Sequence, residues 1–429
     1  MVEQKKDKIK MLVYADSVTA STGFGVVMKN ILLPLHNTGK YEITMLGINY
    51  WGTPHQAPFE IWPVGVESMF SGDKDPYGRL FVQRKIAESE FDILFMLQDS
   101  FILEFVKDFL PKLRQKGKKF TSVIYFPIDG IPKKSWIEAM NVADIPVTYT
   151  EFAKNECIKI IPSMEKRLRI IPHGANMADF YPLSYRENYE FKKAYYRHLA
   201  DRFIVLNVNR NQQRKDIFRT MLAFREFHRK YPDTLLNLHL AVKDQGGDIL
   251  AVADSLGLVP NVDFIFPYNF SPSTGFPVDV LNRIYNSADV VISTSKGEGW
   301  GLAQVEAMAC KTLVISPNNT ACTEIVGEDR GLLVKSGHDI DHLEIMMYDN
   351  EVLRPVVNVQ DLVDKLELAY NDEVLRMKLA ENGYNWVRNT LVWENNIVPL
   401  WEVIFEEAME MKNKGHVVES DGFGEVEEV

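Results

Sequence analysis

Two successive series of short apolar runs, separated by helical stretches, constrain the fold of this chain more than any other feature. Parallel strands joined by crossover helices give this pattern, because both faces of such a sheet are covered and its strands are apolar throughout. The expected strands of the first series are Ile9–Tyr14, Tyr41–Ile48, Ile93–Leu97, Thr121–Phe126 and Ile145–Tyr149. Helical patterns lie between them at Val26–His36, Gly78–Ser89, Phe101–Lys116 and Phe152–Ile160. The series predicts an open α/β sheet.

The second series begins after Arg202 and repeats the same architecture. Its expected strands are Phe203–Asn207, Leu235–Ala241, Val262–Phe266, Val290–Thr294, Thr312–Ser316 and Gly331–Val334. Amphipathic helices are expected at Lys215–Lys230, Asp248–Leu256, Pro277–Ser287 and Leu302–Ala309. After Val334 the pattern becomes helical, and no further strand is expected. The fold class predicted is α/β, with two facing, Rossmann-like, doubly wound domains and a cleft between them, where ligands bind in such folds.

The length of 429 residues agrees with two domains, because single hydrophobic cores stop growing below this size. We expect a first domain at residues 1–175, a linker at 176–200 and a second domain at 201–392. A helix at 393–414 is expected to cross back to the first domain. Residues 415–429 are polar and acidic, and we expect a disordered tail there.

Composition places the chain among ordinary globular proteins, with 46% hydrophobic and 25% charged residues. Cys157, Cys310 and Cys322 lie far apart without metal-ligand spacing, so neither a disulfide framework nor a zinc site is expected. The N-terminus has no apolar run long enough for a signal segment or a membrane span. A cytoplasmic location is the expectation.

The net charge of −11 argues against a surface that grips nucleic acid everywhere, although the acidic tail contributes five of those charges. One local basic run remains, Lys107–Lys119, which reads KDFLPKLRQKGKK. Its position before an apolar strand favours a solvated helix end over a binding patch.

Chemistry is concentrated in Ser295–Cys310, SKGEGWGLAQVEAMAC, which follows an expected strand and opens a helix. Its glycines, at 297, 299 and 301, allow the backbone to approach a ligand closely. Free amides at a helix start favour an anion, so the segment has the design of a phosphate site. Glu298 in the loop and Glu306 in the helix are able to accept hydrogen bonds from hydroxyl groups of the same ligand.

This segment resembles the donor-site signature of the family-4 retaining glycosyltransferases, which adopt the GT-B fold. Other stretches resemble the same family in order and spacing: VLNVNRNQQRKD, IIPHGANMADFYP, IYNSADVVIS, and TEIVG followed by GLLV. The resemblance covers about Ile170 to Leu333 well. In the first half it extends only to architecture and short motifs.

The resemblance implies a metal-independent transfer of a sugar from a nucleotide-sugar donor, which is a co-substrate, with no cofactor. Arg210 and Lys215 would neutralise the donor diphosphate, Glu306 would hold the ribose and Glu298 would contact the sugar. Gly299, Gly301 and Leu302 belong to the same expected donor site. His173 lies where the family often has Asn, and a structural role for it is an equal alternative.

The first domain offers two weaker signals. ASTGFGVV follows the first strand, and we expect its Gly23 and Gly25 to line the cleft. It lacks the third glycine of the dinucleotide fingerprint, which disfavours a nicotinamide enzyme. Many relatives carry a His in the stretch here written VIYFPIDG; Ile128 and Asp129 stand nearest to it. Asp129 is a candidate catalytic residue in its place, with a turn aspartate as the alternative.

The acceptor is not specified by any motif. A small molecule, a glycan, a protein or a modified nucleobase in DNA are all compatible with the pattern, because acceptor loops vary most on such scaffolds. A nucleobase would need basic residues such as Lys133 and Lys134 beside the cleft. A non-catalytic nucleotide-sugar-binding protein of the same fold is the rival outside the enzymes.

Overall fold

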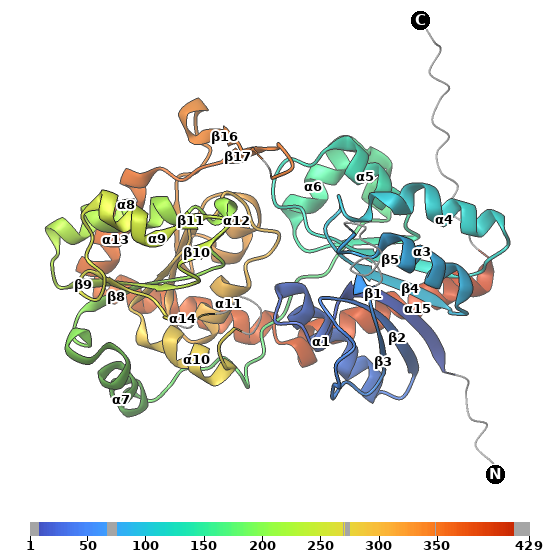
Figure 1. Cartoon of the computed structure of the whole chain (residues 1–429), viewed down its shortest axis with the longest axis horizontal. Helices are drawn as coiled ribbons and strands as arrows, with labels where there is room; N and C mark the ends of the chain where they lie inside the picture. Colours follow the sequence, from blue (N-terminus) through green and yellow to red (C-terminus); the bar gives the residue numbers. More distant parts are fainter. Residues whose placement is uncertain (1–7, 67–74, 269, 271–274, 348, 416–429) are drawn as a thin grey trace, which may run out of the picture.

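The computed structural model describes residues 8–66, 75–268, 270, 275–347 and 349–415 as two α/β domains side by side (Figure 1). The expected tail beyond residue 415 lies outside the described residues. None of the described helices combines the length and the apolar character that crossing a membrane requires.

The first domain is built on a parallel sheet of seven strands in the order β3-β2-β1-β4-β5-β6-β7. Five strands match the predicted ones: β1 (Ile9–Asp16), β2 (Tyr41–Ile48), β4 (Ile93–Leu97), β5 (Thr121–Tyr125) and β6 (Ile145–Thr148). The edge strands β3 (Glu60–Pro63) and β7 (Arg169–Ile170) were not predicted, because runs of four and two residues carry little periodicity.

Helices cover both faces of this sheet, and their residues explain where they begin. Helix α1 (Gly23–Asn37) starts at Thr22, whose side chain accepts a hydrogen bond from the amide of Gly25. The other helices are α3 (Arg79–Glu88), α4 (Val106–Gln115), α5 (Lys134–Asn141) and α6 (Glu151–Ile160). The strands β4, β5 and β6 are buried along their whole length, as expected for a sheet covered on both faces.

The second domain has a parallel sheet of six strands in the order β12-β9-β8-β13-β14-β15. Its strands are β8 (Phe203–Val208), β9 (Thr234–His239), β12 (Phe264–Ile265), β13 (Val290–Ile292), β14 (Leu313–Pro317) and β15 (Leu332–Val334). The helices are α8 (Ile217–Lys230), α9 (Ile249–Leu256), α10 (Val278–Ser287), α11 (Leu302–Ala309), α12 (Thr320–Val326), α13 (Val359–Asn371) and α14 (Glu373–Thr390).

Two segments differ from the sequence-based expectation. The prediction of no strand after Val334 is wrong: β16 (Leu343–Ile345) pairs antiparallel with β17 (Leu353–Pro355), after the short turn η5 (Ile340–His342). Strands of three residues with charged centres show no strand periodicity, which explains the miss. The expected linker at 176–200 contains helix α7 (Tyr185–Tyr196), which begins at a capping box formed by Ser184 and Glu187.

The chain passes between the domains twice, at neighbouring places. Ala175 pairs with Val392 in an isolated bridge, and its amide donates to the carbonyl of Leu391 at 2.6 Å. A π-helical turn (Trp393–Ile397) then leads into α15 (Val398–Lys414), which lies along the first domain (Figure 1). Trp401 and Phe405 of α15 are fully buried there. The two crossings therefore lie side by side.

Candidate active site

A cleft of about 570 Å³ lies between the two domains, at the carboxyl ends of both sheets. The first domain supplies the loops after β4 and β5 together with the start of α5. The second supplies the loop after β8, Gln245 and the hairpin of β16 and β17. Loops that follow parallel strands are where ligand-binding groups gather in such folds.

The glycines of the loop before α11 bring the two domains into contact. Gly297 has a φ of 154°, and a Cβ there would lie 1.9 Å from the carbonyl oxygen of Asp129. A Cβ on Gly299 would lie 2.6 Å from the Cβ of Pro127. Gly301 has a φ of 121° and stands directly before α11. Larger residues at 297 or 299 would therefore push the loop away from the first domain.

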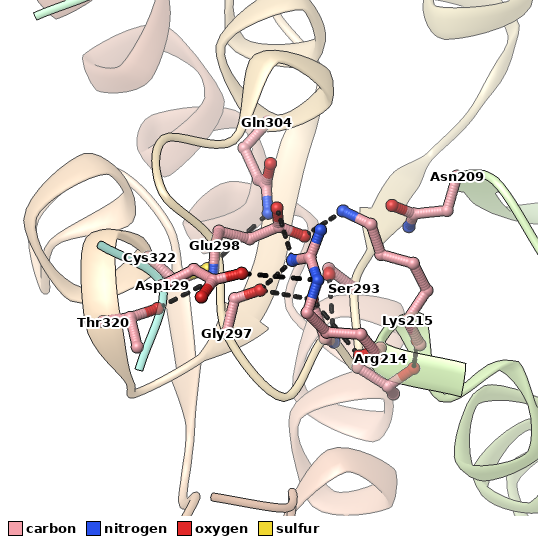
Figure 2. A network of polar contacts seen from close by, with 12 residues as sticks. Asp129, Asn209, Arg214, Lys215, Ser293, Gly297, Glu298, Gln304, Thr320 and Cys322 are labelled. Atoms are coloured by element: carbon pink, nitrogen blue, oxygen red, sulfur yellow. Dashed lines mark hydrogen bonds and ion pairs between the residues drawn. The ribbon is translucent and has the colours of Figure 1, made fainter. Parts of the chain in front are cut away.

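Glu298 lies at the centre of a charge cluster (Figure 2). Lys215 donates to its Oε1, and Nη1 of Arg214 lies 3.4 Å from its Oε2. The backbone amide of Glu298 also donates to the hydroxyl of Thr320 at 2.9 Å. Burial favours a neutral carboxyl, but the two cations outweigh it and lower the pKa of Glu298 to about 2. Glu298 is therefore a carboxylate at neutral pH.

Arg214 is a site residue that the sequence analysis missed. Its guanidinium donates to the carbonyl of Gly297, and its Nε lies 3.5 Å from Oδ2 of Asp129 (Figure 2). Arg210, expected at the diphosphate, instead contacts Asp244 at 2.8 Å and is 48% exposed. The 3-10 turn at Gln213–Lys215 presents Arg214 and Lys215 together. In the sequence, only the position of Arg214 next to Lys215 could have indicated that Arg214 belongs to the site.

Asp129 belongs to the first domain but contacts arginines of the second. Its Oδ1 lies 3.1 Å from Nη1 of Arg354, and its carbonyl oxygen accepts from the same nitrogen at 2.7 Å. Burial would raise the pKa of Asp129, yet Arg354 and Arg214 together lower it. Arg354 comes from β17, in the segment that sequence reasoning left without strands, so its role was not predicted.

Glu306 lies apart from this cluster, on α11, and accepts a hydrogen bond from the hydroxyl of Tyr285 at 2.8 Å. Burial raises the pKa of Glu306 to about 7, because the hydrogen bond from Tyr285 does not offset the lost solvation of its carboxylate. The two glutamates that the sequence placed on one ligand thus have different electrostatic environments.

His173, Gly23 and Gly25 have mainly packing environments. His173 is buried beside Tyr149, at 4.2 Å between ring centroids, and neither ring nitrogen has a hydrogen-bond partner among the described residues. Burial lowers its pKa to about 3, so the ring is neutral. A Cβ on Gly25 would lie 2.4 Å from the carbonyl oxygen of Ala20, whereas one on Gly23 would lie 3.5 Å from Leu302. Gly23 thus brings the start of α1 opposite the start of α11.

The basic run and the only group of metal-ligand type found among the described residues lie in other places. Lys107 contacts Glu138 at 2.8 Å, and Arg114 contacts Asp144 at 2.6 Å, so these cations are matched by acids of the first domain. His338, Asp339 and His342 form an exposed group at the base of the hairpin, with ligand atoms within 4.8 Å. The carboxylate of Asp339 already bonds both rings, at 3.0 and 2.6 Å.

Part of the chain matches a known protein family, and curated proteins resemble it over about 60% of its length. Residues 188–347 match the family described as Glycosyl transferases group 1. The chain is 22% identical over 261 residues to the capsular polysaccharide biosynthesis glycosyltransferase CapM of Staphylococcus aureus. It is 26% identical over 278 residues to a probable sucrose-phosphate synthase of Thermosipho melanesiensis. These matches cover 60% and 61% of this chain, and 61% and 57% of the two relatives, so the chain spans less than two thirds of their length.

Solved structures match nearly the whole chain. A sucrose-phosphate synthase from Thermosynechococcus elongatus aligns with a TM-score of 0.68 at 18% identity, covering 94% of this chain and 99% of that one. Anabaena HepE, solved with UDP and glucose, aligns with a TM-score of 0.66 at 15% identity, covering 93% and 100%. At this identity the likeness establishes the fold. The chain has the GT-B fold, and its residues 188–347 match the model of the Glycosyl transferases group 1 family.

Proposed function

We propose that this protein is a retaining glycosyltransferase that moves a sugar from a nucleotide-sugar donor to an acceptor hydroxyl without a metal ion. The observation that carries the proposal is the group of Arg214, Lys215 and Glu298 beneath the glycine loop that opens α11. Two adjacent cations beside free amides at a helix start suit a diphosphate.

The proposed chemistry needs charge stabilisation at the leaving group. The bond between the sugar C1 and the diphosphate oxygen breaks, and the acceptor oxygen forms a new bond to C1 on the same face. The acceptor proton goes to an oxygen of the departing phosphate. Lys215 and Arg214 would offset the negative charge that grows on the diphosphate, as a metal does in other transferases. No protein nucleophile takes part.

The other donor contacts follow from position. The carboxyl of Glu306, with Tyr285 behind it, suits the ribose hydroxyls, and Glu298 lies where the transferred sugar would meet the loop. Gly299, Gly301 and Leu302 at the start of α11 would contribute backbone amides, and Arg210 would contribute a further cation on leaving Asp244. Asp129 faces them from the first domain and is the candidate to orient the acceptor. HepE, a structural neighbour solved with UDP, supports a nucleoside diphosphate as part of the ligand.

The proposal is tested by incubating the chain with a panel of nucleotide sugars and measuring the release of nucleoside diphosphate. We expect release from at least one donor, and its loss in Lys215→Met. A thermal-shift titration detects donor binding without turnover and so distinguishes an enzyme from a non-catalytic nucleotide-sugar-binding protein. A donor at about 100 times its Kd adds roughly 2.7 kcal/mol of stability. A chain that is stabilised by a donor but releases no diphosphate, with any acceptor, would be a binding protein and not an enzyme.

No described contact favours a nucleobase acceptor over the others. The basic residues that DNA would need are each paired with an acid: Lys107 and Lys134 with Glu138, and Lys133 within 3.9 Å of Glu351. Relatives of this chain are named for different products, among them sucrose-phosphate synthase and D-inositol 3-phosphate glycosyltransferase. The acceptor must therefore be inferred from this chain's own cleft.

A further inference from the structure

The hairpin of β16 and β17 is a wall of the cleft. It leaves the second domain and ends against the first, near α5 and α6 (Figure 1). Arg354 of β17 is only 3% exposed and donates to the backbone and side chain of Asp129 across the cleft. A Cβ on Gly130 would lie 3.1 Å from Nη1 of Arg354, so the first-domain loop fits closely around this guanidinium.

The charged side chains that line the cleft are two arginines and three aspartates. Arg354 lies between Asp129 and Asp349, the latter at 3.2 Å. Arg214 lies between Asp129 and Glu298. The cation of the hairpin, Arg354, is thus already matched by two carboxylates of the chain, whereas Arg214 is the cation proposed above for the donor diphosphate. A phosphate that enters beside Arg354 would have to displace Asp129 or Asp349 from this buried guanidinium, and the contacts that hold the hairpin against the first domain would be lost.

A third acid strengthens this preference. Asp99 follows β4 and lines the cleft on the side of Asp129. Burial, followed by the charge of Asp129, raises the pKa of Asp99 to about 7, so a negative charge is disfavoured at this part of the cleft.

The remaining lining suits hydroxyl groups and a ring of C–H bonds. Phe101 and Trp136 pack together at 5.7 Å between centroids, both half-buried, and line the first-domain side. Gln212, Gln213 and Gln245 line the opposite side with amides that both donate and accept. Aromatic rings with a few convergent polar groups are typical of a small-molecule site.

We propose that this cleft is the acceptor site, that it takes an uncharged, hydroxyl-bearing acceptor such as an unphosphorylated saccharide, and that Asp349 and Arg354 of the hairpin exclude phosphorylated ones. The inference rests on the proposed function, because an acceptor has meaning only if a sugar is transferred. The hairpin acts by keeping Arg354 neutralised, so Arg354 is a specificity-determining residue and not a phosphate ligand.

The test uses matched acceptors with the full chain and a donor that it hydrolyses: glucose with glucose 6-phosphate, fructose with fructose 6-phosphate, and myo-inositol with its monophosphate. A cellooligosaccharide and a hydroxymethylated DNA oligonucleotide complete the panel. We expect a higher kcat/KM for the uncharged member of any pair that reacts. Preference for a phosphorylated member, transfer only to the oligonucleotide, or no transfer to any uncharged compound would overturn the inference.

Variants make the test specific to the hairpin. Asp349→Asn leaves Arg354 with one carboxylate, and we expect the ratio of kcat/KM for phosphorylated over uncharged acceptor to rise about tenfold. Trp136→Ala is expected to raise the acceptor KM about tenfold, with a far smaller change in the donor KM. The matched control is Tyr185→Ala, an exposed aromatic on α7 outside the cleft, which should alter neither value.

An unchanged acceptor ratio in Asp349→Asn, with the variant folded by its thermal transition, would also overturn the inference. Failure of the proposed glycosyltransferase function gives a different result from failure of this acceptor preference. In that case the wild-type chain releases no nucleoside diphosphate from any donor, whatever acceptor is present.

Discussion

The two sides of the cleft are built in different ways. The proposed donor side comes from two segments of the second domain: the glycine loop with Glu298 and Glu306, and the loop after β8 that carries Lys215. The opposite side is assembled from three distant segments: the loops after β4 and β5, and the hairpin of β16 and β17. A site whose residues come from few segments can keep its chemistry when other loops change. A site that is formed by several distant loops changes with each of them.

The largest effect should come from the donor side. Lys215→Met is expected to lower kcat by about 10³-fold, because one oriented charge at the leaving group is removed. It also leaves Glu298 as a buried carboxylate with a weaker partner, so stability should fall by about 3 kcal/mol. Steady-state kinetics and a thermal transition measure the two effects.

The double variant Lys215→Met with Glu298→Gln is the matched control for that prediction. Both buried charges are gone, so most of the stability should return while the activity stays lost. Recovery of activity in the double variant would show that Lys215 serves only the fold, and the donor side would lose its central cation.

The second prediction compares two arginines of the same loop. Arg214→Met should lower kcat/KM about 100-fold, and Arg210→Met should lower it less, because Arg210 is half-exposed and bound to Asp244. Initial rates at several donor concentrations show which of the two variants loses more kcat/KM. A larger loss in Arg210→Met would mean that Arg210 leaves Asp244 and binds the diphosphate. The family resemblance would then have identified the diphosphate cation correctly, and the unliganded structure would not.

The third prediction concerns Glu306 and pH. Its pKa is raised to about 7 in the folded chain, above the ordinary value near 4.5. The folded state therefore binds more protons than the unfolded state between these values, and stability falls as pH rises from about 4.5 to 7. The loss should be on the order of 1–3 kcal/mol and absent in Glu306→Gln. Chemical denaturation at a series of pH values measures it, and parallel curves for both proteins would contradict it.

The smallest effect is expected from chelation. If Lys215 and Arg214 stabilise the leaving group, then EDTA should leave diphosphate release unchanged within about twofold. His338→Ala serves as a control for the exposed His and Asp group at the base of the hairpin. A loss of activity with EDTA that Mg²⁺ or Mn²⁺ restores would contradict the metal-independent mechanism.

The sequence predicted much of the fold because the parallel strands at its centre are continuous apolar runs. Strands β1, β2, β4, β5 and β6 were all expected close to their observed bounds. The hairpin was not, because Leu343–Ile345 and Leu353–Pro355 are short, partly exposed and charged at their centres. Their stability comes from contacts across the cleft, such as Arg354 with Asp129, and no local pattern records such contacts.

The site divides in the same way. Glu298 and Lys215 were expected together and lie together, because glycines and a helix start leave a mark on the local sequence. Arg214 was missed and Arg210 was expected in its place, whereas Arg210 contacts Asp244 in the structure. The sequence alone does not distinguish two arginines in one polar loop, because the 3-10 turn determines where each side chain points. Asp129 was singled out only as a replacement for an absent histidine, and its partner Arg354 lies 225 residues further along the chain.

The most direct measurement of the central claim is a mass-spectrometric and NMR assay of one reaction mixture, containing the full chain, a nucleotide sugar and an uncharged acceptor. The account predicts equimolar nucleoside diphosphate and glycosylated acceptor, with the anomeric configuration of the donor retained and both products absent with Lys215→Met. Product of inverted configuration, or no diphosphate from any donor while the chain remains folded, would contradict it.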